Sequence, residues 1–198
     1  MSQVANRPNW DALFAVALAQ DGLFTTQQAA DSGYSRPLLA RYLKSGRVER
    51  VMHGIYRLVH YPCNESEQLT MLWLWSGREG VFSHDTALFL FDLSDALPSR
   101  VHLTLPNTWR RRRLRVPDIL RLHHADLPAR DRTWVGSVPV TTPGRTLLDC
   151  NSDHVATELV EQATEQALHR GLVTTTELSA VALHERPNRD LRGPHASA

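Results

Sequence analysis

The residues most able to do chemistry include ten histidines, and two short stretches place them beside other reactive side chains. Ser83-His84-Asp85 contains the residue types of a hydrolase triad, and His123-His124-Ala125-Asp126 contains metal-ligand types. Adjacent side chains diverge on a helix and face opposite sides of a strand, so neither spacing builds a site by itself. No HExxH, P-loop, GxGxxG or GxSxG motif occurs. We therefore expect no catalytic activity, metal or cofactor, and interpret Ser83 as a helix N-cap.

A second chemical feature is a run of arginines framed by Trp109 and Leu114. Five guanidinium groups fall within six residues: Arg110, Arg111, Arg112, Arg113 and Arg115. Such groups repel one another, so an anion that neutralised them would be bound well. Three interpretations stay open: a solvated loop between strands, a second phosphate contact, or a docking surface for an acidic partner.

The third feature is the basic stretch SGYSRPLLARYLKSGRVERVMHGIYRL, residues 32–58. Residues 1–60 hold seven basic and four acidic residues, a charge of +3, whereas residues 151–198 carry −3 and the whole chain +1. The N-terminal third is therefore the better candidate for binding a polyanion. The candidate DNA contacts are Ser35, Arg36, Ala40, Arg41, Lys44, Arg47, Arg50, His53 and Arg57.

These side chains need elements to position them, and the pattern predicts three helices followed by a hairpin. Apolar residues recur with helical period from Trp10 to Leu18, and Thr25 with Gln28 fits a capping box for a short helix over 26–32. Ser35 can cap a third helix, over 35–45, with an apolar side and a side of small and basic residues. Residues 48–58 then predict two strands that turn at His53-Gly54.

This order of elements is that of a winged helix-turn-helix, in which the third helix enters the major groove and the hairpin forms the wing. On this interpretation Arg36, Arg41 and Lys44 meet base edges or phosphates, while Arg50, His53 and Arg57 meet the backbone or minor groove. The alternatives are a solvated basic face and a protein-interaction module. The basic residues concentrate on the third helix and the hairpin, which favours DNA binding.

The rest of the chain predicts a mixed domain over 61–185 and a mobile tail over 186–198. Asn64 and Glu67 fit a capping pair for a helix to about Gly77, and its apolar part, 69–75, should be buried between the domains. Strands are predicted near 81–82, 101–106 and 119–124, with a hairpin around Gly136-Ser137. Helices are predicted after Ser83, at Pro143, from about Val155 to Gly171, and after a Thr174/Glu177 capping box. The fold class is therefore α+β, with a winged helix-turn-helix over 1–60.

Composition fits a cytoplasmic protein. The hydrophobic fraction is 42%, no apolar run approaches a membrane span, and the N-terminus lacks a signal-peptide core. Cys63 and Cys150 stand alone, so we expect two reduced thiols.

From about Leu13 to Leu178 the sequence resembles the AbiEi-type antitoxins of type IV toxin–antitoxin systems, which act in abortive infection. The resemblance rests on FTTQQAADSGYSRPLLARYLKSGRVERVMHGIYRL, then on FSHDTALFLFDLSDALPSRVHLTLP, GSVPVTTPGRTLLDC and ATEQALHRGLVTTTEL. The later motifs, taken in order, are more specific than the first block, because many winged helices look alike.

The resemblance implies a transcriptional repressor of its own operon that also neutralises a nucleotidyltransferase-like toxin, with or without direct contact. Winged-helix repressors commonly bind paired half-sites, so we expect a dimer on operator DNA. A second hypothesis stays open: a stand-alone repressor whose C-terminal domain senses a small molecule.

Overall fold

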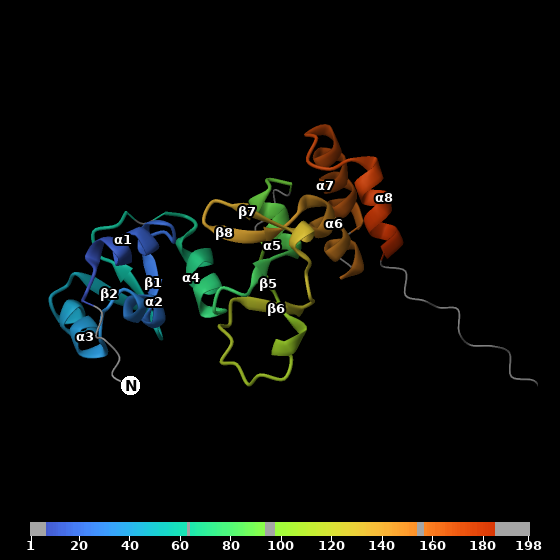
Figure 1. The fold of residues 1–198 in the computed structure, drawn as a ribbon. Helices are drawn as coiled ribbons and strands as arrows, with labels where there is room; N and C mark the ends of the chain where they lie inside the picture. The colour runs from blue at the N-terminus through green and yellow to red at the C-terminus, as the bar shows by residue number, and fades with distance from the viewer. Residues whose placement is uncertain (1–6, 63, 94–97, 154–156, 185–198) are drawn as a thin grey trace, which may run out of the picture.

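Three helices and a small antiparallel sheet form the N-terminal lobe of the computed structural model, which describes residues 7–62, 64–93, 98–153 and 157–184 (Figure 1). The elements are α1 (Trp10–Leu18), β1 (Leu23–Thr25), α2 (Thr26–Asp31), α3 (Arg36–Lys44), β2 (Val48–Met52) and β3 (Ile55–Leu58). The strand order is β1-β3-β2, and Gly54 takes a φ of 77° in the β2–β3 turn. The predicted helices and hairpin are confirmed, whereas β1 was not predicted.

Local side-chain chemistry explains where α2 begins. Thr25 Oγ1 accepts from the Gln28 amide at 3.1 Å, and Gln28 Oε1 accepts from the Thr25 amide at 2.9 Å. The predicted capping box is therefore formed. Gln28 is buried and also donates to Gln20 Oε1 at 2.8 Å, so the box is tied to the segment that follows α1.

The α1 helix is less buried than its apolar pattern suggests. Leu13 and Ala17 enter the core, but Trp10, Phe14 and Leu18 stay 38%, 43% and 54% exposed. The lobe is small, and α1 packs mainly on β1 and α2, with Trp10 stacked on Tyr42 of α3. Phe14 and Leu18, one turn apart, are thus left on the outer side of this helix.

The second lobe is built on a five-stranded mixed sheet in the order β6-β5-β4-β8-β7. Its strands are β4 (Val81–Phe82), β5 (Val101–Leu105), β6 (Leu120–His124), β7 (Arg132–Val135) and β8 (Val138–Thr141), as expected from the sequence. The helices are α5 (His84–Leu90), α6 (Pro143–Ser152), α7 (Thr157–His169) and α8 (Thr175–His184), with short 3-10 turns η1 (Asn107–Trp109) and η2 (Ala129–Asp131). Strand β5, which lies between β6 and β4, is buried at all five positions.

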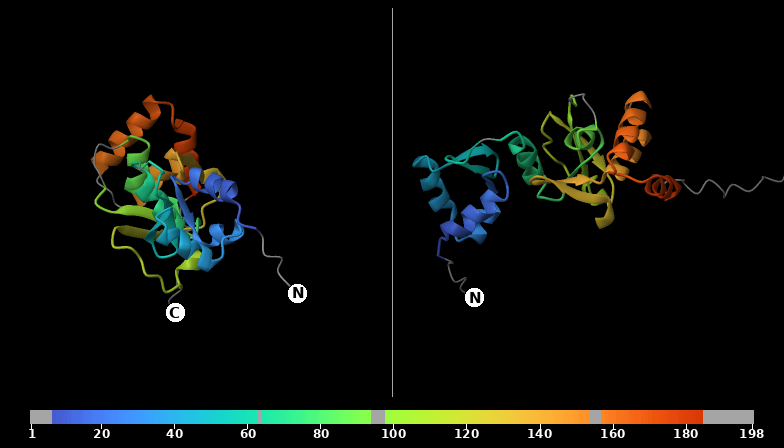
Figure 2. Two further views of the ribbon diagram at one scale, coloured as in Figure 1. Left: turned by 90° about the vertical axis from the view of Figure 1, so that its left-hand side faces the viewer. Right: turned by 90° about the horizontal axis from the view of Figure 1, so that it is seen from above.

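The helix α4 (Glu67–Trp75) stands between the two lobes (Figures 1 and 2). Leu72, Trp73 and Leu74 are buried, and the helix packs on β1 and β3 of the first sheet and on β8 of the second. The prediction that the apolar 69–75 segment is buried between the lobes is therefore confirmed.

The start of α4 corrects one expectation. Asn64 does not cap this helix, because its side-chain amide donates to Asp21 Oδ1 at 2.7 Å, and the N-cap residue Ser66 makes no capping bond. Ser66 Oγ and Thr70 Oγ1 donate to Asp21 Oδ2 at 3.0 and 2.5 Å, and Ser137 Oγ donates to the same oxygen. The first lobe is thus joined to α4 and to the β7–β8 turn through one carboxylate.

Ser83 corrects a second expectation. It occupies the N-cap position of α5 but makes no capping bond; its hydroxyl lies 2.7 Å from Thr104 Oγ1 and 2.9 Å from His84 Nδ1. The capping box of α8 is confirmed, since Glu177 N donates to Thr174 Oγ1 at 3.1 Å and Thr174 N donates to the Glu177 carboxylate at 2.8 Å. Val155, Cys63 and the tail 186–198 lie outside the described residues. None of the helices in the described ranges is long and apolar enough to cross a membrane.

Candidate nucleic-acid interface

The α3 helix presents its basic side to solvent because its apolar side is anchored in the first core. Leu39 is 4% exposed, and Leu38, Tyr42 and Leu43 pack around the same cluster. The opposite side is exposed and consists of Arg36, Pro37, Ala40, Arg41 and Lys44. The helix thus divides as its sequence predicted, with an outward face that can enter a groove.

The start of α3 is set by Ser35 and Pro37. Ser35 Oγ accepts from the Leu38 amide at 3.4 Å, and proline fits the first turn because no backbone donor is needed there. The Ser35 hydroxyl proton is not used by this bond and can still be donated to a phosphate.

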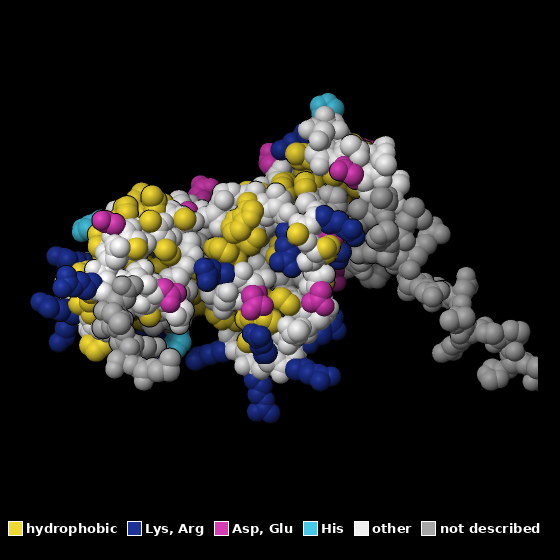
Figure 3. Space-filling model, viewed as in Figure 1, with side chains coloured by type: hydrophobic (Ala, Val, Ile, Leu, Met, Phe, Trp, Pro, Cys, Tyr) yellow, Lys and Arg dark blue, Asp and Glu magenta, His cyan; other side chains and the backbone are white. Residues whose placement is uncertain are grey.

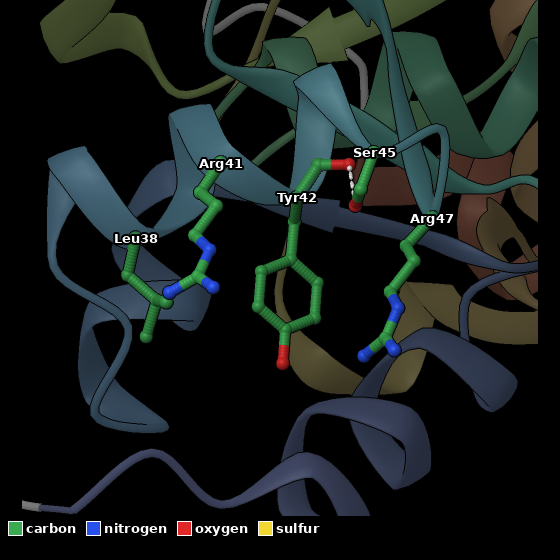
Figure 4. A pocket seen from close by; sticks show the side chains of 5 residues that line it. All are labelled: Leu38, Arg41, Tyr42, Ser45 and Arg47. Atoms are coloured by element: carbon green, nitrogen blue, oxygen red, sulfur yellow. Dashed lines mark hydrogen bonds between the residues drawn. The ribbon is translucent and has the colours of Figure 1, made fainter.

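Two cations flank an aromatic ring where α3 leads into β2 (Figure 4). Arg41 and Arg47 point the same way as the Tyr42 phenol, and the Arg47 guanidinium lies 5.4 Å from the ring centroid. Tyr42 is held by Trp10, stacked with centroids 5.9 Å apart, and by Tyr34, edge-on at 5.4 Å. These three aromatic rings make a rigid base on which two arginines can meet a phosphate.

The wing is tied to the helix-turn-helix by Thr26. Its backbone amide donates to the Gly54 carbonyl at 2.9 Å, and its hydroxyl donates to the same oxygen at 3.2 Å. Arg50 and His53 are exposed beside this turn, with Arg50 Nη2 2.7 Å from His53 Nδ1. The tip of the wing therefore offers two polar side chains at a fixed position relative to α2.

Arg57 differs from the other predicted contacts. It forms ion pairs with Glu49 and with Glu67, the latter at 3.2 Å, and its side chain is 22% exposed. Glu67 begins α4, so Arg57 links the wing to the interlobe helix. We therefore leave Arg57 out of the proposed DNA contacts, because its charge is compensated within the protein.

The arginine run lies between η1 and β6, and all five of its arginines are exposed. Arg112 lies over the Trp109 ring with 4.0 Å to the centroid, and Arg110 Nη2 donates to the His124 carbonyl at 3.2 Å. Figure 3 shows Lys and Arg side chains gathered over the α3 end of the first lobe and around this loop. The three interpretations of the run remain open.

The histidines are arranged differently from the two sequence clusters. His84, His102 and His123 come together, whereas Asp126 accepts two hydrogen bonds from Asn107, at 3.0 and 2.9 Å. Burial lowers the pKa of His84 to about 3 and of His123 to about 4, so both imidazoles are neutral at physiological pH. His102 was not singled out in the sequence; its only local signal was its place in the predicted strand over 101–106.

One comparison with known proteins matches the first lobe, and another matches most of the chain. The model of the family described as "Transcriptional regulator, AbiEi antitoxin" matches residues 11–59. No curated protein matches the chain. Among solved structures, the chain is similar to the crystal structure of the RV2827C protein from Mycobacterium tuberculosis. The TM-score is 0.54 at 16% identity over 94% of this chain and 76% of that chain, so the similarity concerns the fold alone.

Proposed function

We propose that the chain is an AbiEi-type antitoxin and transcriptional regulator, which represses its own operon and neutralises a nucleotidyltransferase-like toxin. The family model that matches residues 11–59 supports this proposal. The observation that carries the proposal is the exposed basic face of α3 beside a wing held by Thr26. We propose further that the protein acts in the cytoplasm, by binding and without catalysis, and as a dimer on paired half-sites.

On the operator, α3 enters the major groove with Arg36, Arg41 and Lys44 toward base edges and phosphates. Ser35 and Ala40 lie on the same outward side as these cations and allow close approach of the DNA. Arg47 contacts a phosphate beside Tyr42, and the wing tip places Arg50 and His53 on the neighbouring backbone or minor groove.

Operator binding is tested by the double variant Arg41→Ala/Lys44→Ala. We expect a loss of about 1–3 kcal/mol for each base-reading contact and a salt slope lower by roughly one for each phosphate contact removed. Fluorescence anisotropy against the upstream DNA of the operon, at three salt concentrations, measures both quantities. Arg130→Ala is the matched control, because its side chain is 73% exposed on the second lobe, away from α3.

Unchanged affinity and salt slope in a folded double variant would exclude α3 as the reading helix.

Co-expression with the neighbouring gene, with growth as the readout, tests the antitoxin role. Full-length Arg41→Ala/Lys44→Ala should still rescue growth when that gene is induced from a separate promoter. Failure of the wild-type protein to rescue would refute the antitoxin proposal while leaving the repressor proposal intact.

The second candidate function is a repressor whose second lobe senses a small molecule. It is favoured by a hollow of about 320 Å³ whose lining includes His84, Arg110 and Arg145. A neighbouring toxin gene whose product the chain neutralises would decide for the antitoxin, whereas release from operator DNA by a metabolite would decide for the sensor.

A further inference from the structure

We propose that His84, His102 and His123 form a binding site for a divalent transition-metal ion of the zinc class. One ring nitrogen of each residue can act as a ligand, and these three atoms all lie within 4.8 Å of one another. The proposal is independent of DNA binding, because the three residues belong to the second lobe.

Three neighbouring strands bring the ligands together. His102 lies on β5 and His123 on β6, two parallel strands in which Thr104 is paired with His123. His84 directly follows Ser83 at the end of β4, which pairs with β5 on its other side. His84 has a φ of 52°, a left-handed conformation that residues other than glycine seldom adopt. The backbone is thus turned at the point where this imidazole joins the other two, an arrangement typical of functional positions.

One nitrogen–nitrogen distance suits two ligands of a shared metal ion. His123 Nε2 lies 3.3 Å from His102 Nδ1. Two ligands of a tetrahedral ion with metal–nitrogen distances of about 2.0–2.1 Å are separated by roughly 3.3–3.4 Å. The His84 ring stacks on the His123 ring with centroids 3.7 Å apart and an interplanar angle of 15°. Rotation of the His84 ring out of this stack would complete three ligands around one ion, since the three ligand atoms already lie within 4.8 Å of one another.

The surrounding groups orient the rings as metal-bound histidines require. A ligating histidine binds the metal through one nitrogen and hydrogen-bonds through the other. Ser83 Oγ contacts Nδ1 of His84 at 2.9 Å, which makes Nε2 its metal ligand. His102 Nε2 lies 3.9 Å from Asp85 Oδ2, an ionic contact that is longer than a hydrogen bond, and its Nδ1 faces His123 Nε2 at 3.3 Å, which leaves Nδ1 for the metal. The other oxygen of Asp85 is buried and has no hydrogen-bond partner among the described residues.

The nitrogen ligands indicate which metal ions the site would bind, and the nearby charged side chains allow a cation to bind there. Nitrogen ligands suit zinc, copper, iron and nickel rather than magnesium or calcium. The nearby cations are compensated, since Arg121 pairs with Asp153 at 2.9 Å and Arg145 with Asp149 at 2.8 Å. The hollow lined by His84 and His123 opens on this site, so a fourth coordination position can take water or an anionic group of a ligand.

Metal binding is tested on the full-length protein with its affinity tag removed, after treatment with a chelator. We expect one equivalent of Zn²⁺ by isothermal titration calorimetry, and visible absorption bands of tetrahedral Co²⁺ when Co²⁺ is used instead. Zn²⁺ at about 100 times its Kd should raise Tm by roughly 5–10 °C. His123→Ala should abolish the Co²⁺ bands, and His124→Ala is the matched control, being the next residue on the same strand.

Asp85→Asn gives a second test that leaves all three imidazoles in place. We expect it to weaken Zn²⁺ binding by about 10–100-fold, because it removes the negative charge that lies next to His102 and favours a bound cation. Circular dichroism confirms folding of every variant. If wild type and His123→Ala bind Zn²⁺ equally, or if wild type takes up no Zn²⁺ or Co²⁺, the histidines are a neutral polar cluster and the proposal is wrong.

Discussion

Asp21→Asn is the substitution that tests how the DNA-binding lobe is joined to the rest of the chain. Four side chains donate hydrogen bonds to this carboxylate: Asn64, Ser66, Thr70 and Ser137. Asparagine has the same shape and tolerates the left-handed backbone that Asp21 adopts, with a φ of 53°. The substitution therefore removes the charge and half of the acceptor capacity without adding backbone strain.

The expected cost is about 2–4 kcal/mol in the free energy of unfolding. Each hydrogen bond to a charged group contributes roughly 1.5–3 kcal/mol. Asn64 lies at the surface and can return to water, and the Thr70 and Ser137 hydroxyls lie 2.9 Å apart and keep each other as partners. The total is therefore less than the sum of four bonds. Urea denaturation followed by tryptophan fluorescence measures it, because Trp73 and Trp75 lie in α4.

The pH dependence of stability shows how much of the effect of Asp21→Asn comes from loss of the negative charge. Burial alone would raise the pKa of Asp21, but the hydrogen bonds from Ser137, Thr70, Asn64 and Ser66 outweigh it, so the pKa is lowered. A lowered pKa in the folded state contributes stability that is complete above the unfolded value of about 3.9 and is lost as the pH falls through the folded value. The difference in the free energy of unfolding between wild type and Asp21→Asn should therefore be constant from pH 7 to about 5 and become smaller below about pH 4.

Asp92→Asn is the matched control, because Asp92 also has a left-handed backbone, with a φ of 57°, but is exposed. We expect a change within about 0.5 kcal/mol at this position. Two results would refute the conclusion that the ionised Asp21 carboxylate stabilises the fold. One is equal stability of Asp21→Asn and wild type at pH 7, and the other is a difference in stability that does not change down to pH 3.

Three further predictions concern single positions. Arg57→Ala should lower the free energy of unfolding by about 1–2 kcal/mol in urea titrations, since it breaks two partly buried ion pairs, and should leave the salt slope of operator binding unchanged. Gly22→Ala should lower Tm in thermal melts by more than a surface Gly→Ala change, because Gly22 has a φ of 79° and an added Cβ would lie 2.5 Å from the Tyr61 ring. Burial raises the pKa of Cys150 well above its usual range, so in a Cys63→Ser background a thiol reagent should label Cys150 only after unfolding; fast labelling at pH 8 in native buffer would contradict this.

Local chemistry made much of this fold predictable from the sequence. The Thr25/Gln28 and Thr174/Glu177 boxes, the glycine turn after His53 and the two-sided pattern of α3 each depend on residues a few positions apart. Backbone capping and side-chain periodicity act over that range, so these elements appear where the residue types place them. The orientation of the basic face of α3 followed as well, because the apolar side had to enter the core.

Contacts between distant residues were decided only by the tertiary structure. The short strand β1 exists because β3 offers it a free edge, and a three-residue segment carries no strand pattern of its own. Asn64 fitted a cap by spacing, but Asp21 competed for its side chain across 43 positions. His84, His102 and His123 are spread over 40 positions and meet because β4, β5 and β6 are neighbours in the sheet. Strand order is set by packing of the whole lobe, so no local pattern could reveal that the three imidazoles converge.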